Sequence, residues 1–60
     1  MAVFIICRVN GRAEIKKEYH GSKEQIKELV MFYIRNYPSY ICTAQSKEEA
    51  EKLLKELNGN

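Results

Sequence analysis

The chain begins with two runs of strand-forming residues, over 2–9 and 12–19, separated by Asn10-Gly11. The first run is apolar and rich in β-branched residues, and the second alternates between polar and apolar positions. Asn-Gly between two such runs is the strongest short-range signal for a β-hairpin. We therefore predict an antiparallel hairpin over residues 2–19.

This hairpin has two possible registers, and they distribute the apolar side chains differently. A two-residue turn pairs Val9 with Arg12 and places the odd-numbered residues of the first strand beside polar residues of the second. A three-residue turn, with Gly11 in the left-handed region, pairs Arg8 with Arg12 instead. The second register is the expected one, because a one-residue slip exchanges the faces and this register gathers the apolar residues on one face. Those residues are Val3, Ile5, Cys7, Ala13, Ile15 and Tyr19.

Residues 23–36 have the pattern of a helix with defined ends. Ser22 and Gln25 predict a capping box, and Pro38 predicts the stop. At about 100° per residue, one apolar stripe contains Ile26, Leu29, Val30, Tyr33, Ile34 and Tyr37. Met31 and Phe32 lie outside this stripe, on opposite flanks of the polar face. Either they fill gaps in the core, with Phe32 under the second helix, or they belong to an interface, where Met and aromatic residues are enriched. One neighbouring helix cannot cover both flanks, so at least one of the two is expected to be partly exposed.

Residues 39–45 predict a third strand, since they are uncharged and favour extended structure. A second helix follows over residues 47–58, with Ser46 as N-cap, Glu49 closing a second capping box and Gly59 just past the end. Its apolar stripe contains Ala50, Leu53, Leu54 and Leu57.

The order of these elements, β-β-α-β-α, predicts a single small α+β domain over residues 1–60. A right-handed crossover through the first helix makes strand 3 parallel to strand 2, and the most apolar strand, the first, belongs in the centre. We expect a two-layer sandwich: a three-stranded antiparallel sheet in the order 2-1-3, with both helices on one face. The other face is then uncovered. It would show Phe4, Ile6 and Arg8, and from strand 3 either Tyr40 and Cys42 or Ile41.

Composition narrows the class of protein. The chain has 60 residues, a size whose core is marginal, and its 45% hydrophobic and 30% charged residues are typical of a globular protein. Its net charge of +2 is too mild to indicate nucleic acid on its own. Two cysteines are too few for a disulfide framework and indicate a reducing compartment. The N-terminal apolar run is too short for a signal peptide and no segment is long enough for a membrane span, so a cytoplasmic protein is expected.

No catalytic, metal or cofactor motif is present in the sequence. His20 is the only histidine and has no convergent partners for acid–base chemistry. Cys7, Cys42 and His20 lack the spacings typical of zinc ligands. A bridge between Cys7 and Cys42 is conceivable because strands 1 and 3 are neighbours, but the reducing compartment argues against it. We expect no enzyme activity, no metal and no cofactor.

The preferred function is therefore protein binding. Strand 2 carries the charged side chains that protect a sheet edge, whereas strand 3 carries none, so we predict a homodimer through the edge of residues 39–45. The protein would be a small homodimeric cytosolic regulator or inhibitor that acts through an exposed apolar surface. The predicted interface residues are Met31, Phe32, Arg35, Tyr40, Ile41 and Thr43.

The alternative function is single-stranded nucleic-acid binding on the open sheet face, where aromatic and basic side chains would stack on bases and contact phosphates. Glu14 and Glu18 interrupt the basic row of strand 2, which ranks this alternative second. Its predicted site consists of Phe4, Ile6, Arg8, Arg12 and Lys16.

Overall fold

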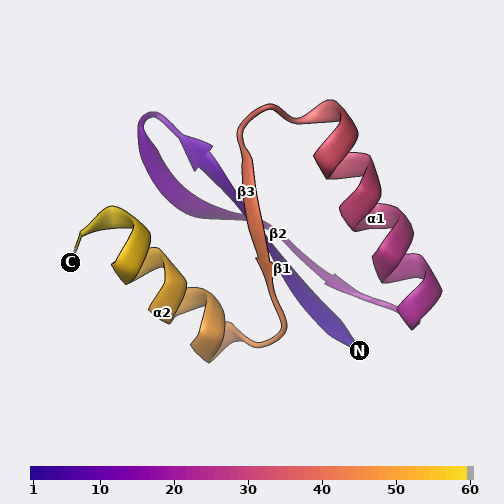
Figure 1. Cartoon of the computed structure of the whole chain (residues 1–60). Coiled ribbons are helices and arrows are strands. Elements are labelled where there is room, and N and C mark those ends of the chain that lie inside the picture. Colours follow the sequence, from indigo (N-terminus) through magenta and orange to yellow (C-terminus); the bar gives the residue numbers. More distant parts are fainter. Residues whose placement is uncertain (60) are drawn as a thin grey trace.

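The computed structural model describes residues 1–59. The elements follow the predicted order, and the antiparallel sheet has the strand order β2-β1-β3, which confirms the predicted α+β topology (Figure 1). The boundaries differ from the predicted ones by no more than one residue. The elements are β1 (Ala2–Val9), β2 (Arg12–His20), α1 (Lys23–Asn36), β3 (Tyr40–Ala44) and α2 (Lys47–Asn58).

The hairpin turn has the two-residue form, so the three-residue register that the apolar pattern favoured is wrong. Val9 pairs with Arg12, and both turn residues have positive φ, 52° at Asn10 and 83° at Gly11. Positive φ at both central positions defines a type I′ turn, whose twist matches that of the flanking strands. Asn and Gly adopt this region more readily than other residues, so the local chemistry of the turn sets the register.

A β-bulge at Lys16 reconciles this turn with the apolar pattern. Ile6 pairs with Ile15 and Ile5 pairs with Lys17, which leaves Lys16 as an extra residue on β2. Because of this extra residue, the odd-numbered side chains of β2 lie on one face of the sheet before Lys16 and on the other face after it. Apolar residues of β2 are therefore directed to both faces of the sheet: Ala13 and Ile15 before the bulge, and Tyr19 after it.

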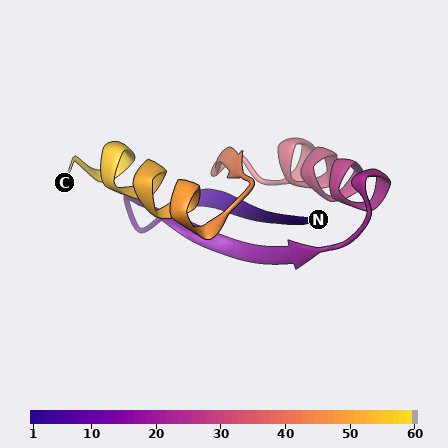
Figure 2. The same ribbon diagram turned by 90° about the horizontal axis from the view of Figure 1, so that it is seen from below.

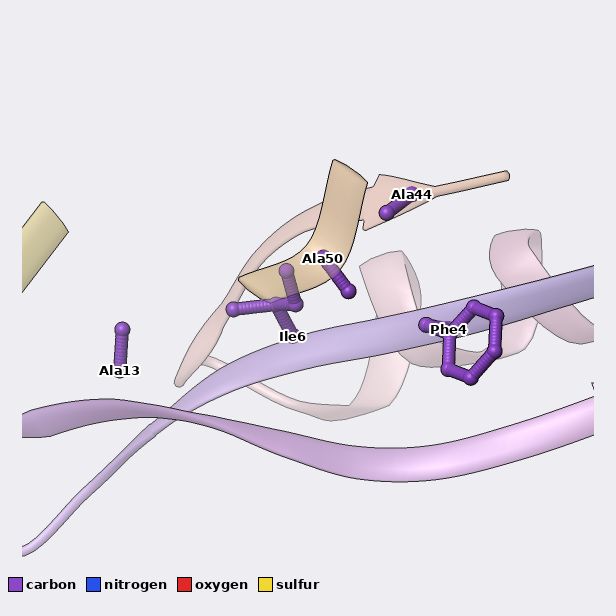
Figure 3. Close-up of a cluster of buried hydrophobic side chains, with 5 residues drawn as sticks. All are labelled: Phe4, Ile6, Ala13, Ala44 and Ala50. Carbon is purple, nitrogen blue, oxygen red and sulfur yellow. The ribbon is translucent and has the colours of Figure 1, made fainter. Parts of the chain in front are cut away.

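The two helices cover opposite faces of β1, so the expectation that both lie on one face is corrected. Phe4 and Ile6 belong to a buried cluster that includes Ala50 of α2 (Figure 3). Ile5, which lies between them, packs against Tyr33 of α1. Successive side chains of a strand point to opposite faces, and Figure 1 shows the helices on either side of β3. The physical reason is the continuous apolar run of β1, which gives each face side chains that need cover.

The molecule is a thin slab of 33 × 25 × 11 Å. Strands about 4.8 Å apart make a three-stranded sheet about 10 Å wide, which is close to the shortest dimension. The strands are therefore stacked through the thickness of the slab. β2 lies at one broad face and β3 at the other, with a helix to either side (Figure 2).

Both helices begin at the predicted caps. Ser22 accepts a hydrogen bond from the Gln25 N–H, and the Gln25 side chain accepts one from the Ser22 N–H, which confirms the first capping box. Ser46 likewise caps α2 by accepting from the Glu49 N–H. The predicted return bond of the second box is wrong, because the Glu49 carboxylate accepts from the N–H of Gln45, one residue further back, at 2.9 Å.

Candidate protein interface

β1 determines which backbone groups of β3 are already hydrogen-bonded. The N–H of Arg8 donates to the carbonyl oxygen of Ser39 at 2.8 Å, so the backbone groups of Arg8 face β3. In an antiparallel ladder every second residue of a strand faces the same neighbour. Since β1 pairs residue by residue without an insertion of its own, Ile6 and Phe4 face β3 as well.

The central residue of the β3 ladder, Thr43, directs its backbone away from β1. Cys42 and Ala44, on either side of it, pair with the β1 residues that face β3. The N–H and C=O of Thr43 therefore point out of the sheet, toward the broad face that looks at the viewer in Figure 1. The Thr43 side chain is held by a 2.7 Å hydrogen bond between its Oγ1 and the hydroxyl of Tyr40. An uncharged strand with outward backbone groups is a template for pairing with another chain.

The remaining predicted residues of β3 lie along the same edge, hereafter the β3 edge (Tyr40–Ala44). Ile41 is the extra residue of a second bulge, because Cys42 pairs with Ile6 and Tyr40 pairs with Cys7. Ile41 and Cys42 pack toward α2, on the same face as Phe4 and Ile6, whereas Tyr40 packs toward α1. Both expected alternatives for that face, Tyr40 with Cys42 or Ile41, are therefore wrong, because the bulge breaks the alternation of side chains along β3. Tyr40, Ile41 and Thr43 are all half-buried.

The opposite edge, β2, is bonded at one residue by a contact that no local sequence pattern predicts. At the end of α2, the Asn58 Oδ1 accepts a hydrogen bond from the N–H of Ala13 at 2.8 Å. The Asn58 Nδ2 donates to the carbonyl oxygen of the same residue at 3.0 Å. One side-chain amide thus takes the place of a neighbouring strand. Exposed charged residues line much of the rest of β2, and such residues oppose edge pairing.

Met31 and Phe32 are both exposed, to 38% and 51% of their surfaces, which confirms that the flanks of α1 are not fully covered. Phe32 does not lie under α2, because α2 is on the other side of the sheet. Its ring contacts Tyr33 at 5.9 Å in an edge-to-face arrangement and Tyr37 at 6.1 Å, measured between ring centroids. We call the following set the α1 surface, a shallow depression lined by Glu24, Lys27, Glu28, Met31, Phe32, Arg35 and Asn36.

The six predicted interface residues therefore form two surfaces instead of one. Met31, Phe32 and Arg35 come together on the α1 surface. The other three line the β3 edge. The sequence predicted the six residues as one set, and the position of α1 beside the sheet separates that set into two surfaces.

Ile34 was expected in the buried stripe of α1, and this expectation is wrong, since 52% of its surface is exposed. Phe32 lines a depression together with Tyr19 of β2, so this flank of α1 faces the β2 side of the slab. Ile34 is two residues further on, about 200° around the helix, and faces the β3 side. It is uncovered there because β3 is the last strand of the sheet.

The open sheet face predicted for nucleic-acid binding does not exist. Phe4 and Ile6 are only 6% and 0% exposed, because α2 covers them (Figure 3). Arg8, Arg12 and Lys16 are exposed, but the aromatic platform on which bases would stack is buried.

The remaining chemically active side chains do not converge. His20 Nε2 lies 2.7 Å from the Glu18 carboxylate on the surface. Cys7 belongs to the cluster under α1 and Cys42 packs against the cluster under α2, so the two thiols lie on opposite faces of the sheet and are not bridged. Burial, with a smaller contribution from Glu49, raises the pKa of the Cys42 thiol and keeps it protonated. Within residues 1–59, no group of three potential metal ligands lies together.

Neither helix of the described residues is both long and apolar enough to cross a membrane. Comparison of the chain with protein-family models, curated proteins and solved structures finds no match. The functional proposal consequently rests on the geometry of the two surfaces.

Proposed function

We propose that this protein is a small cytoplasmic protein-binding module without catalytic activity. It forms a homodimer through the β3 edge. It binds a protein target through the exposed apolar side chains of the α1 surface, and so acts as a regulator or inhibitor.

The contrast between the two sheet edges carries the proposal. The β2 edge is charged and is bonded by Asn58 at Ala13, so its backbone groups are partly satisfied within the molecule. The β3 edge has no charged residue, and the backbone of Thr43 points outward. A strand of this kind pairs readily with a second chain, and a small core gains buried area from that pairing.

The α1 surface supports the second half of the proposal. Met31 and Phe32 are apolar, exposed and surrounded by charged residues, among them Arg35. Aromatic residues, Met and Arg are enriched in protein interfaces, and an apolar centre with a charged rim is their usual arrangement.

Sedimentation equilibrium tests the homodimer, with Thr43→Pro and Thr43→Val as a matched pair. Both variants lose the hydroxyl that bonds Tyr40, but only proline removes the outward N–H. We expect the unmodified chain and Thr43→Val to sediment with the mass of a dimer, and Thr43→Pro to sediment with the mass of a monomer. The circular dichroism spectrum of Thr43→Pro should show that this monomer is folded. An unmodified chain that stays monomeric at high micromolar concentration would refute the homodimer.

Affinity capture from the native cytosol tests the α1 surface, with unmodified protein, Phe32→Ser and Leu57→Ser as baits. Leu57 is the control because it is also a partly exposed apolar residue, 39% against 51% for Phe32, but it lies on α2. We expect Phe32→Ser alone to lose the target while keeping the mass of the dimer. Equal capture by all three baits would remove Phe32 from the target site.

A further inference from the structure

Resting on the proposed homodimer, we infer how the second copy docks. The two-fold axis passes between Thr43 of one copy and Thr43 of the other, and Ile34 of each α1 is buried against α1 of the other copy. The interface is therefore the whole broad face of the slab that carries β3, and not the strand alone.

The outward backbone of Thr43 sets the axis. Its N–H and C=O lie between two residues whose backbone groups are bonded to β1, so it is the residue of the 42–44 segment that offers both groups to a partner. A second copy has the same arrangement. When the strands run antiparallel with Thr43 opposite Thr43 of the second copy, each N–H donates to the other C=O. A shift by one residue would bring an inward-facing residue to this position and lose both bonds.

This axis places both α1 helices on the same face of the joined sheet. Directly opposite residues of antiparallel strands point to the same face. The Thr43 side chain lies on the α1 face, because it is bonded to Tyr40, which packs in the cluster under α1. The two α1 helices therefore become neighbours on one side of the dimer, and the two α2 helices become neighbours on the other.

In this arrangement the second copy covers Ile34, an apolar residue that is exposed in the single chain. It lies on the flank of α1 that faces the β3 side, and 52% of its surface is exposed in the single chain. The residues along the β3 edge are uncharged, and all except the buried Ala44 are half-buried, so a second copy meets no like charge at the axis.

The size of this face leaves room for a stable dimer. The two longer extents of the molecule, 33 × 25 Å, bound the broad face at roughly 800 Å². Stable protein interfaces bury about 800 Å² on each partner. A dimer that used only the five residues of β3 would bury far less, so the flanking helices are required.

Disulfide trapping tests the axis in a Cys42→Ser background, where the remaining Cys7 is buried. Thr43→Cys on the axis brings two Cα atoms to about 5.5 Å, within the range of a disulfide. Diamide then joins the sulfurs, and the two protons and two electrons of the thiols reduce its azo bond to a hydrazine. We expect a covalent dimer from Thr43→Cys and none from Glu18→Cys, an exposed control on β2.

Sedimentation of Ile34→Ser tests the helix contact, with Phe32→Ser as the control on the flank of α1 that faces β2. Both residues are exposed in the single chain, at 52% and 51%, so neither change should unfold it. We expect Ile34→Ser to raise the dissociation constant of the dimer by roughly tenfold or more, and Phe32→Ser to leave it unchanged.

The results separate this inference from the proposed function. If the chain dimerises but Thr43→Cys does not form a covalent dimer, or if Ile34→Ser does not weaken the dimer, the docking geometry is wrong and the proposal of a homodimer is unaffected. A monomeric unmodified chain overturns both.

Discussion

Replacing Asn58 by Ala tests whether one side-chain amide closes the β2 edge. The substitution removes two hydrogen bonds to the backbone of Ala13, at 2.8 and 3.0 Å, without changing the charge of the chain. Ala13 is only 2% exposed, so its backbone groups are only poorly compensated by water.

The magnitude follows from the two bonds and the helix. Each bond contributes about 0.5–1.5 kcal/mol, which gives a loss of about 1–3 kcal/mol. Ala is a better helix former than Asn by up to about 0.7 kcal/mol, and this gain opposes the loss at the last residue of α2. We expect the free energy of unfolding to fall by about 1–2 kcal/mol, a large fraction for a domain of this size.

Urea denaturation followed by circular dichroism measures the change, at one fixed protein concentration because dimerisation adds to the apparent stability. Glu56→Ala is the control, since it lies exposed on the same turn of α2 and should change the free energy by less than about 0.5 kcal/mol. The exchange rate of the Ala13 amide hydrogen gives a second readout and should rise in Asn58→Ala only. If Asn58→Ala changes neither the free energy of unfolding nor the exchange rate of the Ala13 amide, the two hydrogen bonds between Asn58 and Ala13 do not form in solution.

Three further predictions concern single residues. Phe32→Ser should lower the free energy of unfolding, measured in urea, by less than about 1 kcal/mol, because Phe32 is exposed. Tyr33→Ala should lower it by about 3–5 kcal/mol, because the Tyr33 ring is buried. Equal losses in the two variants would contradict the exposure of Phe32. Burial, then Tyr37 and Cys7, raise the pKa of Tyr33 above 10.0, so the unfolded chain ionises first and the free energy of unfolding should fall as pH rises above 10. Tyr33→Phe should flatten this fall in urea titrations, and an unchanged slope would exclude Tyr33 as its source. Gly11→Ala, at φ 83°, should cost roughly 1 kcal/mol in thermal denaturation, and a neutral result would argue against the left-handed turn.

The sequence by itself determined where each element begins and ends. Asn10-Gly11 at the turn, Ser22 at the start of α1 and Gly59 at the left-handed end of α2 all act on their own few neighbours. Such signals do not depend on the rest of the chain, which is why the boundaries could be predicted. The strand order also followed, because a continuous apolar run belongs in the centre of a sheet.

The sequence also grouped part of the candidate site. The absence of charge on β3 and the position of Met31 and Phe32 outside the apolar stripe are both visible in the residues alone. Their arrangement in two separate surfaces is not, because it depends on which side of the sheet α1 occupies.

Only the tertiary structure decided which face each side chain meets. The turn at Gly11 and the apolar pattern of β2 demand different registers, and the bulge at Lys16 satisfies both because α1 and α2 cover opposite faces. The contact of Asn58 with Ala13 joins residues 45 positions apart, and the exposure of Ile34 depends on where the sheet ends. Each of these outcomes depends on contacts between residues that are distant in the chain. The periodicity of apolar residues along the sequence does not show which of the possible contacts forms.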